Sequence, residues 1–251
     1  MESVVDEFVF IVGPVLVTFL STTGHATSGV VTAFTLATVG ALLFASQRRT
    51  EPPPGGHESR NGPSAMRTPG LRVLFVVGAA VGSILGTLEI ALVAFADQEN
   101  AMSLSGVLIA GLALGSMASG IGWGAVHWSY PLRHRLAVVL ILMTLLSIPL
   151  LLISDVWVMV PFVVVAGVAV SPSLISSFTL AELLVPRSAV TEAFTWIGTA
   201  LAMESVVDVS GANAAFLVAT VAAAIAAVVV GLSQRFLHVP AEHAAQPALA
   251  A

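Results

Sequence analysis

Long apolar runs alternate with short polar breaks along almost the whole chain. A helix crosses a hydrocarbon core of about 30 Å with about twenty apolar residues, and eight runs approach or exceed that length. They cover residues 4–21, 26–46, 71–96, 102–127, 136–153, 156–180, 190–207 and 214–232. This pattern predicts an all-α membrane protein with eight transmembrane helices.

The amino-acid composition agrees with this prediction. Hydrophobic residues make up 57% of the 251-residue chain and charged residues 9%, whereas a soluble globular domain has roughly 25% charged residues. Because the apolar runs recur from end to end, a single secretory signal does not explain them. The chain has no cysteine, which excludes disulfides and thiolate metal ligands.

The longest polar interruption, residues 47–72, is rich in proline and glycine and contains five arginines. All nine basic residues of the chain are arginines, and they fall in this loop, in alternate loops after it or in the C-terminal tail. Cytoplasmic loops of membrane proteins carry an excess of Lys and Arg. We therefore expect this loop and both chain termini to lie in the cytoplasm.

Glu89 is the one carboxylate well inside an expected span, the helix over 71–96. Gly78, Gly82 and Gly86 precede it at four-residue spacing and share its helix face, where small residues allow close packing. In the fourth span Gly111, Gly115 and Ser119 have the same spacing and predict close packing there as well. Ionisable residues at such a depth are rare and face a cavity or another helix. Glu89 is therefore either a proton-coupling or substrate-binding group, or a structural carboxyl that is protonated or hydrogen-bonded to a neighbouring helix.

Further candidates lie in the first and sixth spans. Asp6 and Glu7 open the first span; they are candidates for proton coupling, although acids at a helix start also favour the positive end of the helix dipole. Gly13 and Pro14 indicate a conformational element, because proline removes one backbone hydrogen bond and glycine permits a tight bend. Pro161 and Pro172 predict a kink in the sixth span, because each lacks an amide donor.

A basic break at residues 129–135 precedes the fifth span. Its Arg133 and Arg135 are gating candidates that could pair with a carboxylate such as Glu192, and topology alone would also place arginines there. Four serines near Pro172 could line a polar path or bond back to carbonyls of their own helix: Ser171, Ser173, Ser176 and Ser177.

Residue patterns that mark common enzyme classes are missing from the sequence. The six histidines do not form the His/Glu spacing of a metal site. There is no Walker-type phosphate loop and no G-x-S-x-G elbow. We expect no enzymatic activity, no metal, no cofactor and no nucleic-acid partner.

Five segments spread over the chain carry a family resemblance: ESVVDEFVFIVGP (Glu2 to Pro14), QRRTEPPP, GTLEIALVAFA, AVSPSLISSFTLAELLVP and TEAFTWIGTAL. In this order they resemble the fifth helix, the start of the central cytoplasmic loop, and the seventh, tenth and eleventh helices of the major facilitator superfamily. The resemblance is to its bacterial efflux-type members, and the Gly-Pro pair is similar to their antiporter-type motif.

The resemblance implies a partial major facilitator fold that contains helices five to twelve and lacks the first four. Residues 1–46 are then the last two helices of an N-terminal half, residues 47–70 the linker loop, residues 71–237 the six-helix C-terminal half, and residues 238–251 a disordered tail. The span over 190–207 is short for its role, because about eighteen residues give roughly 27 Å of helix.

The resemblance also implies a function. It indicates a secondary active transporter of the bacterial plasma membrane that exports a small organic solute or drug in exchange for protons. Helices seven and ten line the cavity in the superfamily, so we expect the spans over 71–96 and 156–180 to share one cavity. The missing helices or a second chain would complete the path. The alternative is a truncated remnant that inserts without transporting, or a membrane assembly partner.

Overall fold

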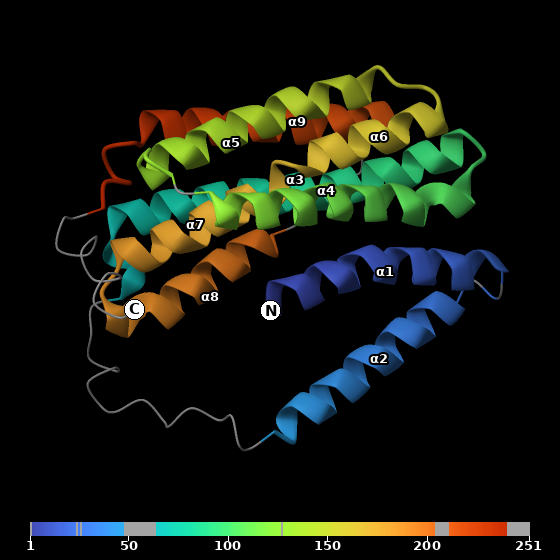
Figure 1. The fold of residues 1–251 in the computed structure, drawn as a ribbon, viewed down its shortest axis with the longest axis horizontal. Helices are drawn as coiled ribbons and strands as arrows, with labels where there is room; N and C mark the ends of the chain where they lie inside the picture. Colours follow the sequence, from blue (N-terminus) through green and yellow to red (C-terminus); the bar gives the residue numbers. More distant parts are fainter. Residues whose placement is uncertain are drawn as a thin grey trace.

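The computed structural model describes the backbone at residues 2–23, 25, 27–47, 64–126, 128–203 and 211–239, and the side chains of these residues except 2–11 and 14. The described chain is helical and contains no β-strand (Figure 1). The all-α class expected from the sequence is confirmed. The α-helices are α1 (Glu2–Thr23), α2 (Ser28–Ala45), α3 (Pro69–Gln98), α4 (Ser105–Ala125), α5 (Leu132–Ser147), α6 (Val156–Gly167), α7 (Val170–Leu184), α8 (Val190–Leu201) and α9 (Ala212–Leu232).

Short 3-10 helices continue or precede several α-helices. They are η3 (Ala65–Arg67), η4 (Met102–Leu104), η5 (Ile148–Leu151) and η6 (Arg187–Ala189). Among the described residues, six helical segments are long and apolar enough to cross a membrane. They are Ser28–Ser46, Pro69–Gln98, Met102–Ala125, Leu132–Leu151, Val156–Leu184 and Ala212–Leu232. These six segments indicate a multi-pass membrane protein.

The helix expected over 190–207 is shorter in the structure. It is described as α8, a 12-residue helix that ends at Leu201, and 12 residues at 1.5 Å each give about 18 Å. That length is below the roughly 30 Å of a hydrocarbon core. Residues 204–210 lie outside the described chain, so α8 as described does not reach across the membrane.

Helix α3 lies at the centre of the helices that follow the polar loop. It packs against α9, α8, α4 and α7, while α5 packs against α9 and α7 (Figure 1). Helix α4 also packs against α6 on one side and against α1 on the other. Helix α2 runs back from the end of α1 and packs against it. The first two helices therefore join the rest of the molecule through α1 and α4.

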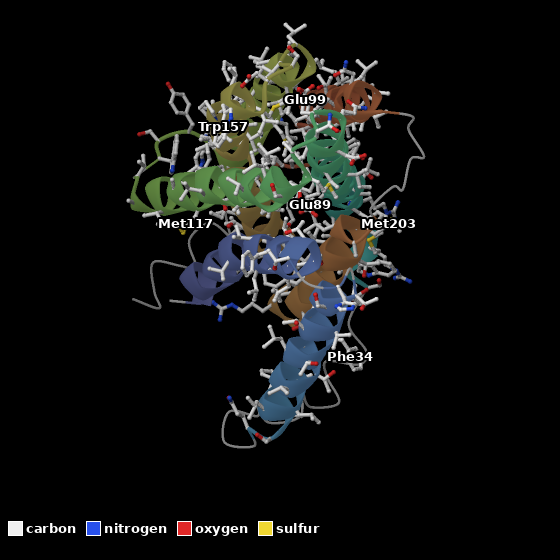
Figure 2. All side chains as sticks on the ribbon, turned by 90° about the vertical axis from the view of Figure 1, so that its right-hand side faces the viewer. Phe34, Glu89, Glu99, Met117, Trp157 and Met203 are labelled. Atoms are coloured by element: carbon white, nitrogen blue, oxygen red, sulfur yellow. The ribbon has the colours of Figure 1, made fainter. Side chains whose placement is uncertain are left out.

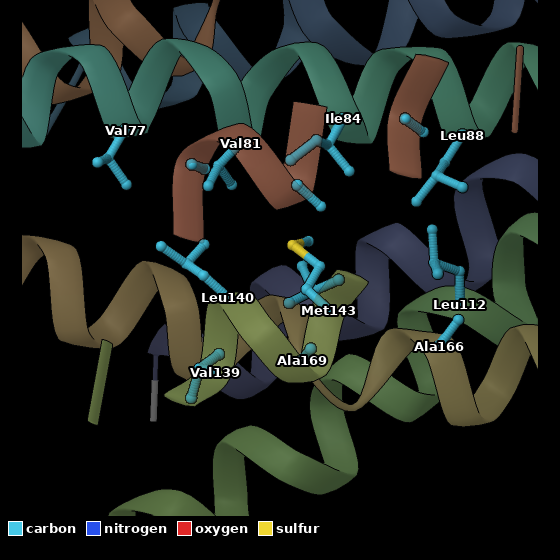
Figure 3. Close-up of a cluster of buried hydrophobic side chains, with 14 of the residues drawn as sticks. Val77, Val81, Ile84, Leu88, Leu112, Val139, Leu140, Met143, Ala166 and Ala169 are labelled. Atoms are coloured by element: carbon cyan, nitrogen blue, oxygen red, sulfur yellow. The ribbon is translucent and has the colours of Figure 1, made fainter. Parts of the chain in front are cut away.

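One stripe of α3 forms the middle of the buried core (Figure 3). Val77, Val81 and Ile84 are almost fully buried and face Leu140 and Met143 of α5. Lipid tails are as apolar as these side chains, so helices in a membrane are held together by van der Waals contacts and close packing rather than by escape from water. The close fit of the core side chains therefore stabilises this arrangement of the helices.

Close approach of helices depends on glycines at two crossings. A Cβ atom on Gly115 of α4 would overlap the carbonyl oxygen of Val164 in α6, and one on Gly82 of α3 would overlap the carbonyl oxygen of Leu201 in α8. Gly78, four residues before Gly82, lies in contact distance of α8 as well. The close packing expected from the small-residue spacing is confirmed at these positions.

The sixth span is broken before Pro172, as the sequence predicted. Helix α6 ends at Gly167 and α7 begins at Val170, so Pro172 is the third residue of α7. Proline has no amide hydrogen to donate to the carbonyl of Val168, four residues earlier. At Val168 the backbone leaves the α-helical pattern: its amide donates to the carbonyl of Val165, three residues earlier, at 3.2 Å. The missing donor is consistent with the break at this point. Pro161 lacks the same donor and lies inside α6 without ending it.

The fifth span begins earlier than expected. We predicted a start at residue 136, but α5 begins at Leu132, directly after Pro131. A proline with φ of −56° holds the chain in a conformation that leads into a helix. Arg133 and Arg135 therefore lie on the first turn of α5 and not in the preceding loop.

The arginines of the described chain gather at one end of the molecule. The side-chain amide of Gln234, near the end of α9, donates to the backbone carbonyl of Arg133 at 3.3 Å. Gly70, at the start of α3, packs against Phe236 and against Leu184 at the end of α7. These contacts bring together the helix ends that carry Arg67, Arg72, Arg133, Arg135, Arg187 and Arg235. By the positive-inside rule, this is the expected cytoplasmic end.

Large apolar side chains cover the outer surface. Phe34 of α2 and Trp157 of α6 are each 72% exposed and point outward (Figure 2). Gly29 is the only buried residue of α2. A soluble protein would not expose so many large apolar residues, so these faces are suited to lipid or to another helix.

Candidate functional site

Glu89 lines a cavity between three helices. The other lining residues are Leu85 of α3, four residues of α4 and two residues of α7: Ile109, Leu112, Ala113, Ser116, Val170 and Leu174. The cavity has a volume of about 130 Å³. Its wall is apolar apart from the Glu89 carboxyl and the Ser116 hydroxyl. The spans over 71–96 and 156–180 therefore do share one cavity, as expected.

Glu89 also lines a second, wider hollow. This outer groove has a volume of about 540 Å³ and runs along α3 to Asp97, with Met102 on its other side. Glu89 and Ile109 belong to the walls of both the cavity and the groove. Glu89 therefore lies where the cavity between α3, α4 and α7 meets a groove that runs along α3 toward Asp97.

The position of Glu89 along α3 follows from helix geometry. Gly82 and Glu89 are seven residues apart, close to two full turns, so they share a helix face about 10 Å apart. At Gly82 this face is covered by the end of α8, and the hydroxyl of Ser83 donates to the carbonyl of Met203 at 3.1 Å. Helix α8 ends at this level, and Glu89 lies beyond it as an exposed residue of the described chain.

A pair of serine hydroxyls joins two walls of the cavity. Ser116 Oγ and Ser171 Oγ lie 2.8 Å apart and are buried. Ser173 and Ser177 instead donate to backbone carbonyls of α7, Val170 and Ser173 respectively. Ser173 and Ser177 therefore follow the second alternative and bond within their own helix. Ser171 binds α4 instead, and none of the four serines is among the lining residues of the cavity.

The gating pair considered from the sequence does not form in the described chain. Both carboxylate oxygens of Glu192 bind the end of the polar loop: Oε1 accepts from Ser64 Oγ at 2.7 Å and Oε2 from the Ala65 amide at 3.0 Å. These two hydrogen bonds, that of Ser64 foremost, hold the pKa of Glu192 below its usual range. Glu192 thus ties α8 to the loop end, while Arg133 and Arg135 line a different pocket.

Several candidates lie partly or wholly outside the described chain. The side chains of Asp6, Glu7 and Pro14 are outside it, so their expected roles stay predictions. The backbone of α1 is helical through Gly13, and a Cβ atom there would meet no atom within 4 Å. Gly13 therefore makes no close helix approach in the described structure, and its role as a conformational element also stays a prediction.

Some residues of the site had no clear signal in the sequence. Ile109 and Ser116 lie on α4, which the sequence marked for close packing but not for a cavity. The one available hint was that Ser116 follows Gly115, which approaches α6 closely. Ser64 binds Glu192 across a separation of 128 residues, and only the folded chain brings these two together. In the described chain no group of three or more His, Asp or Glu residues could hold a metal ion.

No protein-family model matches the chain, and neither curated proteins nor solved structures include a significant match to it. The function is therefore inferred from the geometry of the cavity, from the distribution of charge and from the resemblance of the five segments.

Proposed function

We propose that the chain is a secondary active transporter in which Glu89 carries protons in exchange for a small organic solute. The observation that carries the proposal is the place of Glu89, on the common wall of an interior cavity and an outer groove. Intramembrane carboxylates mark proton relays and substrate paths in transporters. A carboxyl at this junction can exchange protons with either side as the path changes its opening.

The walls of the cavity indicate the chemistry of the solute. Apolar side chains surround a single carboxyl and a single hydroxyl, and small-molecule sites commonly combine apolar walls with a few polar groups that fix orientation. A lipophilic solute, neutral or cationic, suits this lining. A volume of about 130 Å³ admits only a small molecule, so a larger drug requires the helices around Glu89 to move apart.

The architecture that we propose is a partial major facilitator fold. Helices α1 and α2 are then the last two helices of an N-terminal half, and α3 to α9 form the C-terminal half. The break between α6 and α7 and the resemblance of the five segments support this assignment. The arginine end then faces the cytoplasm of a bacterial cell, and the resemblance to efflux-type proteins gives export as the proposed direction of transport.

The transport proposal can be tested with the purified chain in liposomes. Ethidium serves as the probe solute and a pH-sensitive dye reports protons. We expect an imposed pH gradient to drive ethidium across the membrane, and a protonophore to stop that movement. If neither ethidium nor protons move in liposomes that contain correctly inserted protein, the proposal is wrong for this chain by itself.

The exposure of α2 favours a second candidate function, that of a membrane assembly partner that does not transport by itself. Gly29 is the only buried residue of this 18-residue helix, and the large apolar side chains of α2 are exposed. Additional helices from a second chain would cover that face. Single cysteines at Phe34 and Val31 in the cysteine-free chain test this candidate, because a disulfide to another chain in the membrane would support it and labelling by lipid-soluble reagents alone would oppose it.

A further inference from the structure

A second pocket lies at the end of the molecule where the described arginines gather. Its residues are far from Glu89 in the sequence. Three elements build it: the start of α5, the end of α7 and the segment after α9. Its lining residues are Tyr130, Pro131, Leu132, Arg133, Arg135, Leu183, Leu237, His238 and Val239, and its volume is about 310 Å³. We call it the arginine pocket. Two guanidinium groups, a phenol and an imidazole share it with several apolar side chains.

The arginine pocket has positive charge, and none of its described lining residues carries a carboxylate. The Nε atoms of Arg133 and Arg135 are both buried and have no hydrogen-bond acceptor among the described residues. Glu182 is next to the lining residue Leu183 in sequence, but it is exposed and does not line the pocket. Buried donors are almost always paired in folded proteins, so two guanidinium Nε atoms that lack a partner among the described residues can take an acceptor from a bound ligand.

The start of α5 adds to the positive character. Arg133 and Arg135 lie on the first turn of this 16-residue helix, where the helix dipole is positive. Pro131, at the cap position, supplies no side-chain acceptor to the free amides of that turn. Two cations at the positive end of a helix are unfavourable by themselves, and an anion bound between them removes the repulsion.

Aromatic residues near the arginine pocket indicate its position relative to the membrane surface. Trp123 and Trp128 pack with ring centroids 4.1 Å apart, and the Arg135 guanidinium lies 5.6 Å from the centroid of the Trp128 ring. Tyr130 beside them is 71% exposed. Tryptophan and tyrosine gather at the headgroup level of membranes. The pocket therefore lies where lipid phosphates are concentrated.

We propose that the arginine pocket binds a phosphate group. Guanidinium groups donate paired hydrogen bonds to phosphate oxygens, and basic pockets between membrane helices on the cytoplasmic side bind lipid headgroups. Tyr130 and His238 supply further polar groups, and Leu132 and Leu237 supply an apolar wall suited to the glycerol part of a lipid. The phosphate comes either from an anionic lipid or from a soluble phosphate compound, and both present the same oxygens to the two arginines.

The test compares two variants that lose the same charge at the same end of the molecule. In R133Q/R135Q the two pocket arginines are replaced. In the control R67Q/R187Q two exposed arginines outside the pocket are replaced. Each protein is kept in dodecyl maltoside micelles, which contain no phosphate, and its Tm is measured as phosphatidylglycerol is added to the micelles, or as sn-glycerol 3-phosphate is added in solution.

We expect a phosphate-bearing ligand to raise the Tm of the wild type and of the control. The apparent affinity of R133Q/R135Q for that ligand should be lower by about tenfold or more, since each lost charged hydrogen bond is worth about a factor of ten. A rise with phosphatidylglycerol alone identifies a lipid site, and a rise with glycerol 3-phosphate identifies a site for a soluble phosphate. No rise in either series, or an equal rise in both variants, overturns the proposal.

A second variant covers the case in which R133Q/R135Q does not fold. R133K/R135K keeps both charges but loses the planar pair of donors. We expect it to fold and to show a weaker response to phosphate than the wild type does. A full response in R133K/R135K would show that charge alone attracts the ligand and would contradict a built phosphate site.

Discussion

Ser116 of α4 and Ser171 of α7 share a hydrogen bond of 2.8 Å beside the Glu89 cavity. The same two helices are held close by small residues, because a Cβ atom on Gly120 would lie 3.0 Å from the Cβ of Ser171. Ser171 directly precedes Pro172, at the break in the sixth span. The hydroxyl pair therefore fixes the start of α7 against α4 at the wall of the cavity.

We predict that this hydroxyl pair contributes measurably to stability. Ser116→Ala and Ser171→Ala should each lower the free energy of unfolding, and a double-mutant cycle should give a coupling of about 0.6 kcal/mol, typical of hydrogen bonds between membrane helices. Ser119→Ala is the control, because its hydroxyl bonds to the carbonyl of Ser116 in its own helix at 2.9 Å. A coupling near zero from unfolding in detergent would contradict the prediction.

The α4 and α6 crossing gives a prediction about packing. Gly115→Ala should destabilise the fold by about 1–3 kcal/mol, because its Cβ atom would overlap the backbone carbonyl of Val164 and force the helices apart. Gly122→Ala on the same helix is a matched control, since a Cβ atom there meets no atom within 4 Å. Thermal unfolding of both variants measures the difference. Equal Tm values for the two variants would show that α4 and α6 do not meet at Gly115.

Glu192 predicts a pH-dependent contribution to stability. Its folded-state pKa lies below the usual value, with the hydrogen bond from Ser64 as the largest cause. A lowered folded pKa gives stability that is present above the unfolded pKa, about 4.3, and is lost as pH falls through the folded value. Glu192→Gln should therefore lower the Tm at neutral pH. The difference from the wild type should shrink below about pH 4, and Ser64→Ala should weaken the same effect.

The arginine distribution predicts the topology. Single cysteines at Ser129 and Ser64 should resist a membrane-impermeant maleimide in intact cells, while cysteines at Asn100 and Ser154 should react, because the positive-inside rule places the arginine end in the cytoplasm. The chain has no native cysteine, so the background is clean. Reaction of Ser129→Cys in intact cells would contradict the orientation expected from the arginines.

Features that depend on local chemistry could be predicted from the sequence. Pro172 removes one backbone donor wherever the chain folds, so the break before it was foreseeable. The spacing of Gly78, Gly82 and Gly115 likewise indicated close helix contacts, and the structure provides them. The gathering of the arginines at one end follows from the alternation of spans and loops. Each of these predictions requires only neighbours along the chain.

Features that depend on distant contacts could not be predicted in the same way. Nothing near Glu192 in the sequence identifies Ser64 as its hydrogen-bond donor, and the pairing considered with Arg133 and Arg135 is not formed in the described chain. The contact between the end of α8 at Leu201 and Gly82 of α3 likewise joins residues far apart in the sequence. Which helices enclose Glu89 is likewise a property of the packed bundle, since periodicity gives the face of a helix but not its neighbour.

The most direct test of the account is proton flux through liposomes that contain the wild type, Glu89→Gln or Glu99→Gln. Glu99 is an exposed carboxylate in the turn after α3, so Glu99→Gln loses the same charge outside the cavity. We predict proton flux in the wild type and in Glu99→Gln, and at least about a tenfold loss in Glu89→Gln, because a glutamine keeps the shape of the side chain but cannot carry a proton. Undiminished flux in folded, inserted Glu89→Gln would contradict the central claim and leave Glu89 as a structural carboxyl.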